Sequence, residues 1–245
     1  MADKIMMLEA NGLKIKFKNT RADRGVLKDL LFNDKAYFGN FRNFFGNKVN
    51  FSGIMLDIGA NIGAVSVWAA KIEGMKVIAY EPVPETFELL RENVKLNNAE
   101  NLIVVHNQAV SNYNGKAVIH YSRSQTTAAS IYNLEKGNPN KVEVDAVDIR
   151  DIIKKYQEIN FLKLDCEGSE YDILNSIEDF NKIKNMFVEF HIKKDTPRTY
   201  KVKNLNHTKE EADQIIRILS KDFELKIIQK SCNAEDLINV YAVRV

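Results

Sequence analysis

The sequence Ile54-Met-Leu-Asp-Ile-Gly-Ala-Asn-Ile-Gly63 decides the fold of this chain. An apolar run leads to Asp57, glycines follow at Gly59 and Gly63, and a stretch with helical spacing of apolar residues begins directly afterwards. This order predicts a buried strand, a tight glycine turn and the start of a helix. Such a turn presents backbone N–H groups and the positive end of a helix beside one acidic side chain. We therefore expect a ligand with a nucleoside or an amino-acid moiety at this turn.

The composition is that of an ordinary globular chain. Its 245 residues suffice for one large domain or one domain with additions, and 45% hydrophobic and 28% charged residues are typical of soluble proteins. A formal net charge of +2 gives no strong global field, so we expect no nucleic-acid and no membrane partner. Cys166 and Cys232 lie far apart without a CxxC motif, which argues against a disulfide framework or a zinc site. Because the sequence shows neither a signal-peptide core nor an apolar run of about 18 residues, we expect a cytoplasmic location.

Strands and helices are predicted to alternate along the chain, which favours an α/β fold with a doubly wound sheet. Pro84 can open one of the helices, and Asp148 can cap another. The last two strands follow each other without a helix, which predicts an antiparallel hairpin at the edge of the sheet. The expected strands lie at 54–56, 76–80, 102–105, 115–121, 141–147, 161–164, 186–191, 223–228 and 237–243, and further helices lie at 64–71, 149–156, 170–177 and 209–220.

We divide the chain at residue 50. Residues 1–50 are expected to form an N-terminal extension with a hairpin and a helical, aromatic-rich segment, and residues 51–245 form the main domain. Two polar stretches, 122–140 and 192–208, are expected to be long loops. The second loop carries basic residues that are either solvated or recognise an anionic acceptor: Lys193, Lys194, Arg198, Lys201 and Lys203.

Polar side chains collect where the predicted strands end, which is where open α/β sheets bind ligands. Glu81 ends the second strand 24 positions after Asp57, close to the offset of about 20 residues at which a carboxylate holds ribose hydroxyls in dinucleotide-binding folds. A nicotinamide site needs a Gly-x-Gly-x-x-Gly turn, but Asn61 stands where the middle glycine would be. The turn therefore favours a different nucleoside cofactor and leaves a nicotinamide-dependent oxidoreductase as an alternative.

Five motifs follow one another along the chain: Asp57-Ile-Gly-Ala-Asn-Ile-Gly63, Tyr80-Glu81-Pro82, Asn107-Gln-Ala-Val110, Lys163-Leu-Asp-Cys-Glu-Gly-Ser-Glu170 and Val188-Glu-Phe-His191. Together they resemble the FkbM family of S-adenosylmethionine-dependent methyltransferases, over roughly residues 54 to 228. The resemblance implies the class I methyltransferase fold, a Rossmann-like three-layer sandwich. Its seven-stranded, mostly parallel sheet has an antiparallel last strand. The resemblance also implies S-adenosyl-L-methionine as methyl donor.

The resemblance further implies where the cofactor lies. The glycine turn is expected to line its methionine end with help from Asp57, and Glu81 is expected to bind the ribose diol. The segment from Asn107 to Ala109 borders the adenine, and Asp165 lies near the sulfonium or amino group. The expected cofactor residues are Asp57, Gly59, Ala60, Asn61, Gly63, Glu81, Pro82, Asn107, Gln108, Ala109 and Asp165.

Catalysis is expected from the acids and the histidine at the ends of the last two parallel strands. His191 is the candidate base, because imidazole titrates near neutrality, although a histidine with a purely structural role is the alternative. Glu189 can orient His191 or bind the acceptor, since the two side chains share one face of a strand. Glu167 and Glu170 can fix acceptor hydroxyls or hold a divalent metal with Asp165, and for Glu170 a helix-start role is the stronger alternative. We expect no metal.

The expected function is O-methylation of a hydroxyl on a sugar or another small metabolite. A nucleic-acid methyltransferase is disfavoured, because the chain lacks an Asn/Asp-Pro-Pro-aromatic element and a basic face of duplex size. A non-catalytic module that binds S-adenosylmethionine is the other alternative, and Glu167, Glu189 and His191 argue against it. The acceptor and the oligomeric state do not follow from the sequence.

Overall fold

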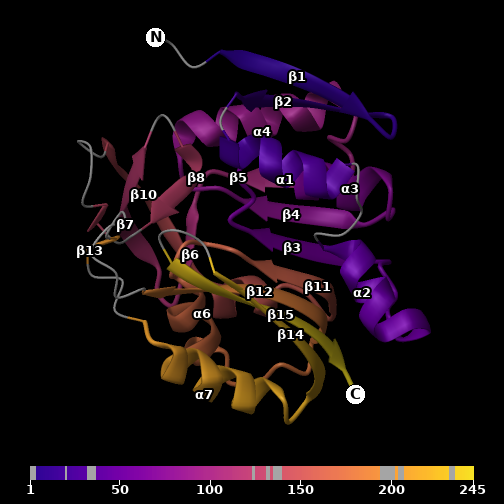
Figure 1. The fold of residues 1–245 in the computed structure, drawn as a ribbon, viewed down its shortest axis with the longest axis vertical. Coiled ribbons are helices and arrows are strands. Elements are labelled where there is room, and N and C mark those ends of the chain that lie inside the picture. The colour runs from indigo at the N-terminus through magenta and orange to yellow at the C-terminus, as the bar shows by residue number, and fades with distance from the viewer. Residues whose placement is uncertain are drawn as a thin grey trace.

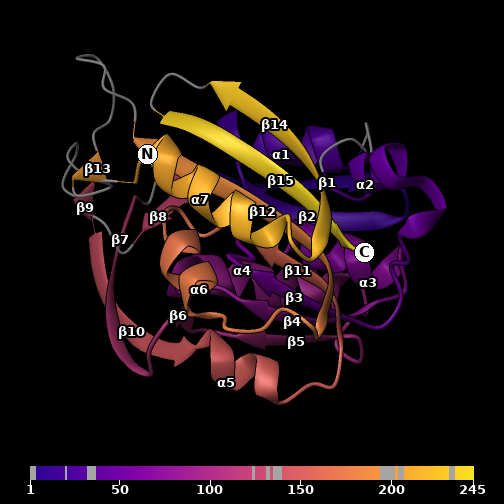
Figure 2. The same ribbon diagram turned by 90° about the horizontal axis from the view of Figure 1, so that it is seen from below.

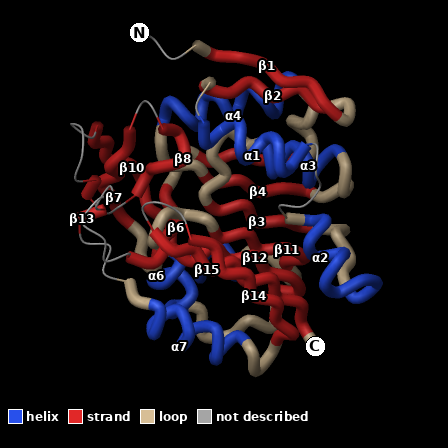
Figure 3. The backbone as a smooth tube through the Cα atoms, in the orientation of Figure 1, coloured by secondary structure: helices blue, strands red, loops and turns tan. Residues whose placement is uncertain are grey.

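A seven-stranded sheet forms the centre of the molecule, as the red strands in Figure 3 show. The computed structural model describes residues 4–19, 21–31, 37–122, 125–130, 133–134, 140–193, 202–203, 207–231 and 235–245. The strand order is β14-β15-β12-β11-β3-β4-β5. The strands are β3 (Ile54–Ile58), β4 (Lys76–Tyr80), β5 (Ile103–His106), β11 (Ile159–Leu164), β12 (Ile183–Lys193), β14 (Phe223–Ser231) and β15 (Glu235–Arg244).

Only the last strand of this sheet runs against the others. β15 pairs antiparallel with both β12 and β14, whereas the other pairings are parallel. The expected seven-stranded, mostly parallel sheet with a terminal hairpin is confirmed, with β14 at the edge and β15 inside it. The strand order reverses between β3 and β11, so the carboxyl ends of these strands mark a topological switch point.

Helices cover both faces of the sheet and make three layers (Figures 1 and 2). Neighbouring strand residues point to opposite faces, so Met55 and Phe161 pack in one core while Leu56 and Leu162 pack in the other. On one side lie α3 (Ala64–Lys71) and α4 (Pro84–Leu96), and on the other lie α5 (Ile149–Lys154), α6 (Glu170–Ser176) and α7 (Lys209–Leu219).

Several helices begin at residues that favour a helix N-terminus, namely a first-turn proline and capping side chains. Pro84 stands in the first turn of α4, where its missing N–H costs no hydrogen bond. The Asp148 side chain caps α5 by accepting from the Arg150 N–H, as expected. Thr208 and Glu211 form a capping box at the start of α7. None of the helices in the described ranges is long and apolar enough to cross a membrane.

The N-terminal segment packs on the face that carries α3 and α4. Its elements are β1 (Ile5–Ala10), β2 (Leu13–Lys18), α1 (Arg21–Leu31), α2 (Phe38–Phe45) and the short 3-10 helix η1 (Gly46–Lys48). Phe41 of α2 is fully buried against Phe161 and Tyr241 of the central sheet. Asn93 of α4 donates to the Lys16 carbonyl and accepts from its N–H. The segment therefore shares a core with the sheet, and the division at residue 50 stays a prediction.

A second, four-stranded sheet was not predicted. Its order is β6-β10-β7-β8, from β6 (Ala109–Ser111), β7 (Gly115–Ser122), β8 (Gln125–Ser130) and β10 (Asn140–Asp148). The strands expected at 115–121 and 141–147 are present, but the prediction of one loop over 122–140 is wrong, because β8 pairs with β7. Backbone pairing along a sheet edge does not require apolar side chains, so polar composition concealed this strand.

The second predicted loop, 192–208, is also shorter than expected. β12 continues to Lys193, and β13 (Val202–Lys203) pairs with β9 (Asn133–Leu134). The side chains of the basic group from Lys193 to Lys203 lie outside the described residues, so their expected role stays a prediction.

Candidate functional site

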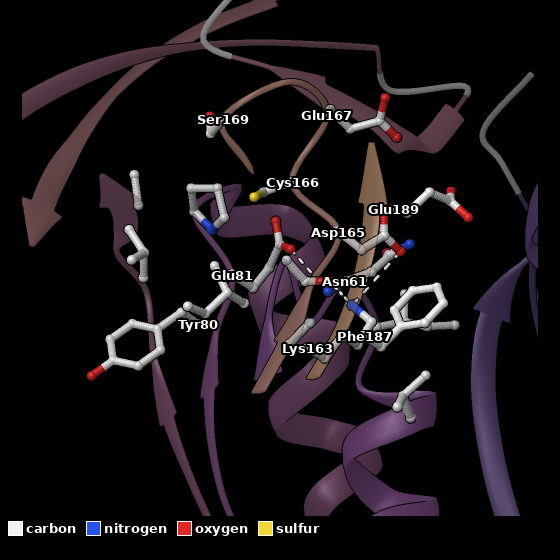
Figure 4. A pocket seen from close by; sticks show the side chains of 18 of the residues that line it. Asn61, Tyr80, Glu81, Lys163, Asp165, Cys166, Glu167, Ser169, Phe187 and Glu189 are labelled. Atoms are coloured by element: carbon white, nitrogen blue, oxygen red, sulfur yellow. Dashed lines mark hydrogen bonds and ion pairs between the residues drawn. The ribbon is translucent and has the colours of Figure 1, made fainter. Parts of the chain in front are cut away.

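A cavity of about 320 Å³ lies at the switch point and is within the range of about 300–1,000 Å³ typical of small-molecule sites. The ends of β3, β4 and β11 form its base, and the second sheet forms one wall through Ala109 and Ile119. The N-terminal segment closes another side with Leu27 and Tyr37. Figure 4 shows Asn61, Glu81, Lys163, Asp165 and Glu189 around this space.

The glycine turn brings the backbone close to the neighbouring strand end. Gly59 has a φ of +75°, and a Cβ placed there would lie 1.8 Å from the carbonyl oxygen of Asp165. The N–H groups of Gly59 and Ala60 donate to the Tyr80 carbonyl, which fastens the turn to β4. Gly59 is therefore required both for its left-handed backbone and for the close approach to Asp165.

Glu81 joins the turn to the end of β4 (Figure 4). Its Oε2 accepts from the Asn61 N–H at 2.9 Å, and its Oε1 accepts from the Val83 N–H at 2.9 Å. Because a carboxylate oxygen has a second lone pair, each oxygen can accept one more hydrogen bond, which suits a pair of ribose hydroxyls. Burial raises the pKa of Glu81 to about 7, although both N–H donors oppose this shift.

One buried oxygen at the turn points to a ligand with a hydrogen-bond donor. Oδ1 of Asn61 has no hydrogen-bond partner among the described residues, and Asn61 lines the cavity. A buried oxygen without a partner costs free energy unless a ligand or water satisfies it. The turn, the Glu81 carboxylate and this oxygen together present acceptors to a ligand, and their expected contacts with the methionine and ribose parts of S-adenosylmethionine stay predictions.

Asp57 lies beneath the cavity and does not line it. Its fully buried carboxylate accepts from Ser66 Oγ at 2.6 Å and lies 3.2 Å from Lys163 Nζ. Lys163 lines the cavity, donates to the Gly59 carbonyl at 3.0 Å and lies 3.7 Å from Asp165 Oδ2. Burial lowers the pKa of Lys163, but the charges of Asp57 and Asp165 outweigh it and raise that pKa above its ordinary value. Asp57 is therefore linked to the cavity wall by Lys163, a residue to which the sequence motifs assigned no role.

His191 lies behind the acids that face the cavity. It is 3% exposed and does not line the cavity. Its Nδ1 lies 3.2 Å from Glu170 Oε1, and its Nε2 lies 3.6 Å from Glu167 Oε2 and 3.9 Å from Glu189 Oε1. Glu167, Glu189 and His191 thus lie close together, as expected, while their catalytic roles stay predictions.

Glu170 does more than begin α6. Its two carboxylate oxygens accept from the Cys166 N–H at 2.7 Å and the Gly168 N–H at 2.8 Å, so it shapes the loop before the helix. It also contacts His191 Nδ1, which fixes the orientation of the ring. Burial raises the pKa of Glu170, but His191 and the N–H donors outweigh it and lower that pKa.

The predicted site residues divide into two groups. Those that line the cavity are Gly59, Ala60, Asn61, Glu81, Pro82, Gln108, Ala109, Asp165, Glu167 and Glu189. Those that do not line it are Asp57, Gly63, Asn107 and His191. Asn107, for example, donates to the carbonyls of Glu81 and Pro82 and orders that turn.

Sequence reasoning missed several lining residues that come from other parts of the chain. Tyr37 and Leu27 belong to the N-terminal segment, and Lys230 and Asn239 belong to the terminal hairpin. No motif carries these residues, because they reach the cavity through tertiary packing alone. Lys163 also lines the cavity, and here the sequence did hold a clue, because a charged residue inside an apolar strand is unusual.

The family model described as the methyltransferase FkbM domain matches residues 57–225. Methyltransferase 1 of Beauveria bassiana (strain ARSEF 2860) is 24% identical over 158 residues, 55% of this chain and 63% of that protein. Methyltransferase sdnD of Sordaria araneosa is 24% identical over 168 residues, 55% of this chain and 65% of that protein. The alignments with these curated relatives thus span less than two thirds of the relatives' length.

A solved structure supports the architecture. The protein PH0793 of Pyrococcus horikoshii superposes with a TM-score of 0.52 and 15% sequence identity, over 99% of this chain and 73% of that chain. At this identity the likeness concerns the fold alone. Together with the sheet order and the family match, it confirms the expected α/β fold of class I methyltransferases.

Proposed function

Since the chain belongs to the FkbM methyltransferase family, we propose that it transfers a methyl group from S-adenosyl-L-methionine to a hydroxyl of a small acceptor. A sugar or another hydroxylated metabolite is the acceptor class that we favour. One observation carries the proposal: a single cavity joins the diol acceptor Glu81 to the acidic group Asp165, Glu167 and Glu189. Family membership also confirms S-adenosylmethionine as the expected cofactor.

The cofactor half of the cavity explains how this chain would hold the methyl donor. Glu81 would accept from the two ribose hydroxyls, and Asn61 Oδ1 would accept from the methionine end. Ala109 and Ile119 supply an apolar wall for the adenine. When bound, S-adenosylmethionine supplies an electrophilic methyl group on a sulfonium and leaves as S-adenosylhomocysteine.

The acceptor half would orient the hydroxyl and take its proton. Glu189 lines the cavity and can contact the acceptor directly, whereas His191 lies behind Glu189 and Glu167. We therefore assign the proton to Glu189 and regard His191 as a residue that acts through its neighbours. The sequence-based assignment of the base to His191 stays an alternative, because a shift of the Glu167 side chain would give Nε2 access to the cavity.

The geometry of a hydroxyl methylation places few demands on the protein beyond position. The acceptor oxygen and the methyl carbon must approach to about 3 Å in line. The walls formed by Tyr37 and Leu27 on one side and Ala117 on the other confine the space in which an acceptor can lie. This confinement favours a small acceptor over a nucleic acid, in agreement with the weak net charge of +2.

A panel of hydroxylated acceptors, sugars first, tests the proposal through release of S-adenosylhomocysteine. We expect at least one acceptor to raise the release rate well above the rate without acceptor, and Glu189→Gln to lower it. Tight binding of NADH with no affinity for S-adenosylhomocysteine would instead support an oxidoreductase. Binding of S-adenosylhomocysteine without turnover of any acceptor would support the non-catalytic module.

A further inference from the structure

We infer that Asp165, Glu167 and His191 bind a divalent cation at the acceptor end of the cavity, with open coordination positions for the acceptor hydroxyl. The site lies beyond the carboxyl ends of two neighbouring strands, since Asp165 follows β11 and His191 stands near the end of β12. The inference departs from the sequence-based expectation of no metal, and it deepens the proposed function on which it rests.

The donor atoms are already gathered. One oxygen each from Asp165 and Glu167 and one ring nitrogen of His191 lie within 4.8 Å of one another, and Nε2 lies 3.6 Å from Glu167 Oε2. Two atoms that each bind an ion at about 2.1 Å are at most about 4.2 Å apart. A pair of donors 4.8 Å apart would therefore have to approach by at least roughly half an ångström on binding, which carboxylate side chains can provide by rotation.

The Glu167 backbone adopts a conformation that is rare for a residue other than glycine. Its φ is +55°, in the left-handed region that a non-glycine residue seldom occupies. Strained conformations of this kind persist where the surroundings impose them, and they collect at ligand sites. The Glu167 side chain lines the cavity, and its Oε2 lies 3.6 Å from His191 Nε2.

The orientation of His191 matches that of a metal ligand. Nδ1 contacts the buried Glu170 carboxylate at 3.2 Å, and backbone N–H groups hold Glu170 in turn. Histidines that bind metals usually donate their second ring nitrogen to a carboxylate or carbonyl, which fixes the tautomer and directs the other nitrogen at the ion. Glu170 thus leaves Nε2 as the nitrogen that faces Glu167 and the cavity acids.

The local charges favour a cation. Asp165, Glu167 and Glu189 all line this end of the cavity. Two lysines, Lys163 and Lys230, also line the cavity, and Lys163 forms ion pairs with both the buried Asp57 and Asp165. Several carboxylates in one partly buried space repel one another unless a cation lies between them. The proposed ion would reduce this repulsion.

A buried amide oxygen near Glu189 supports a ligand at this end of the cavity. Asn239 is 1% exposed and lines the cavity, and it stands opposite Glu189 in the pairing of β12 with β15. Its Oδ1 lacks a hydrogen-bond partner within the described part of the chain. A water molecule or hydroxyl bound to the cation would be a donor for this oxygen.

Two carboxylates and one imidazole form an oxygen-rich set that suits Mn²⁺ and similar ions better than a thiolate-seeking metal. An acceptor hydroxyl bound to such an ion loses its proton more readily, because the positive charge stabilises the alkoxide. In the transfer, the acceptor oxygen bonds to the methyl carbon as the sulfur–carbon bond breaks and its electron pair stays on sulfur. Glu189, which lines the same cavity, takes the proton.

Binding of Mn²⁺ alone tests the site without any assay of activity. The full chain is treated with EDTA, dialysed and titrated with MnCl₂ while electron paramagnetic resonance follows free Mn²⁺. We expect one saturable site, about 10-fold or more weaker in Glu167→Gln and in His191→Gln, and about 10-fold weaker in Glu170→Gln. Glu158→Gln, an exposed acid paired with Lys184, is the matched control and should bind as the unaltered chain does.

The outcomes separate this inference from the proposed function. Circular dichroism and S-adenosylhomocysteine affinity show that each variant is folded. No saturable binding of Mn²⁺, Mg²⁺ or Zn²⁺ below about 1 mM, equal binding by Glu167→Gln and Glu158→Gln, or displacement of Mn²⁺ by S-adenosylhomocysteine overturns the metal site. Methyl transfer that continues in EDTA likewise overturns the metal but leaves the methyltransferase. Site-specific Mn²⁺ binding without methylation of any acceptor supports the site and contradicts the function.

Discussion

The backbone N–H of Asn61 donates to Oε2 of Glu81 across 2.9 Å, so the glycine turn and the end of β4 form one unit. The same carboxylate holds the Val83 N–H with its other oxygen. Glu81 is therefore a structural link within the apo site as well as the expected ribose ligand, and its replacement should affect both properties.

Glu81→Gln should weaken binding of S-adenosylhomocysteine by about 10- to 100-fold, since a hydrogen bond to a charged group contributes roughly 1.5–3 kcal/mol. The amide of Gln keeps one acceptor oxygen but replaces the other with a donor, so it cannot accept from both ribose hydroxyls. Isothermal calorimetry measures the change. Glu88→Gln on the exposed face of α4 is the control and should leave the affinity unchanged; equal affinities in both variants would remove Glu81 from the cofactor site.

The stability of the apo protein should depend on pH through Glu81. Burial raises its folded-state pKa from 4.5 to about 7, so between these values the folded state binds more protons than the unfolded state. The contribution of protonated Glu81 to the free energy of unfolding is therefore fully present below pH 4.5 and is lost as the pH rises through about 7. Relative to Glu81→Gln, the unaltered chain should lose about 3 kcal/mol of unfolding free energy over this window. Urea unfolding at several pH values measures the difference between the two proteins, and a difference independent of pH would contradict the prediction.

Gly59→Ala should destabilise the fold for two separable reasons. The residue has a φ of +75°, and an added Cβ would lie 1.8 Å from the Asp165 carbonyl oxygen. Gly74 has a nearly equal φ of +74° with no atom within 4 Å of such a Cβ. Gly74→Ala should therefore cost only about 1 kcal/mol for the backbone conformation, and Gly59→Ala roughly 3 kcal/mol or more. Equal losses in urea unfolding would show that the turn can move away from Asp165.

The sequence was sufficient for features that local chemistry determines. The apolar run, the glycines and the helical spacing around Gly59 predicted the turn, because strand, turn and helix are adjacent along the chain. The second sheet was missed, because β10 pairs with β6 and β7 across long sequence separations that no local pattern encodes. Tyr37 and Asn239 were missed for the same reason.

The role of individual charged residues was harder to predict than their presence at the site. Asp57 was expected to help hold the cofactor, which stays a prediction, and its carboxylate contacts Ser66 and Lys163 below the cavity. Glu170 was expected mainly to begin a helix, yet it also holds His191. In both cases one partner comes from another strand, Lys163 from β11 and His191 from β12, so the role of the side chain depends on the tertiary fold.

Lys163→Met should destabilise the protein by about 3–5 kcal/mol, because it leaves the buried carboxylate of Asp57 without its cation. Lys163 is 2% exposed and Asp57 is fully buried, so solvent cannot replace the lost partner. Asp57→Asn in the same chain should recover a large part of the loss, since it removes the uncompensated charge while the amide oxygen can still accept from Ser66 Oγ. Urea unfolding of the two single variants and the double variant measures this coupling. The exposed pair Lys154 and Asp151 provides the control cycle, in which a coupling below about 1 kcal/mol is expected. Additive losses at Lys163 and Asp57 would show that the two residues act independently, and that Lys163 stabilises the fold through the Gly59 carbonyl and Asp165 instead.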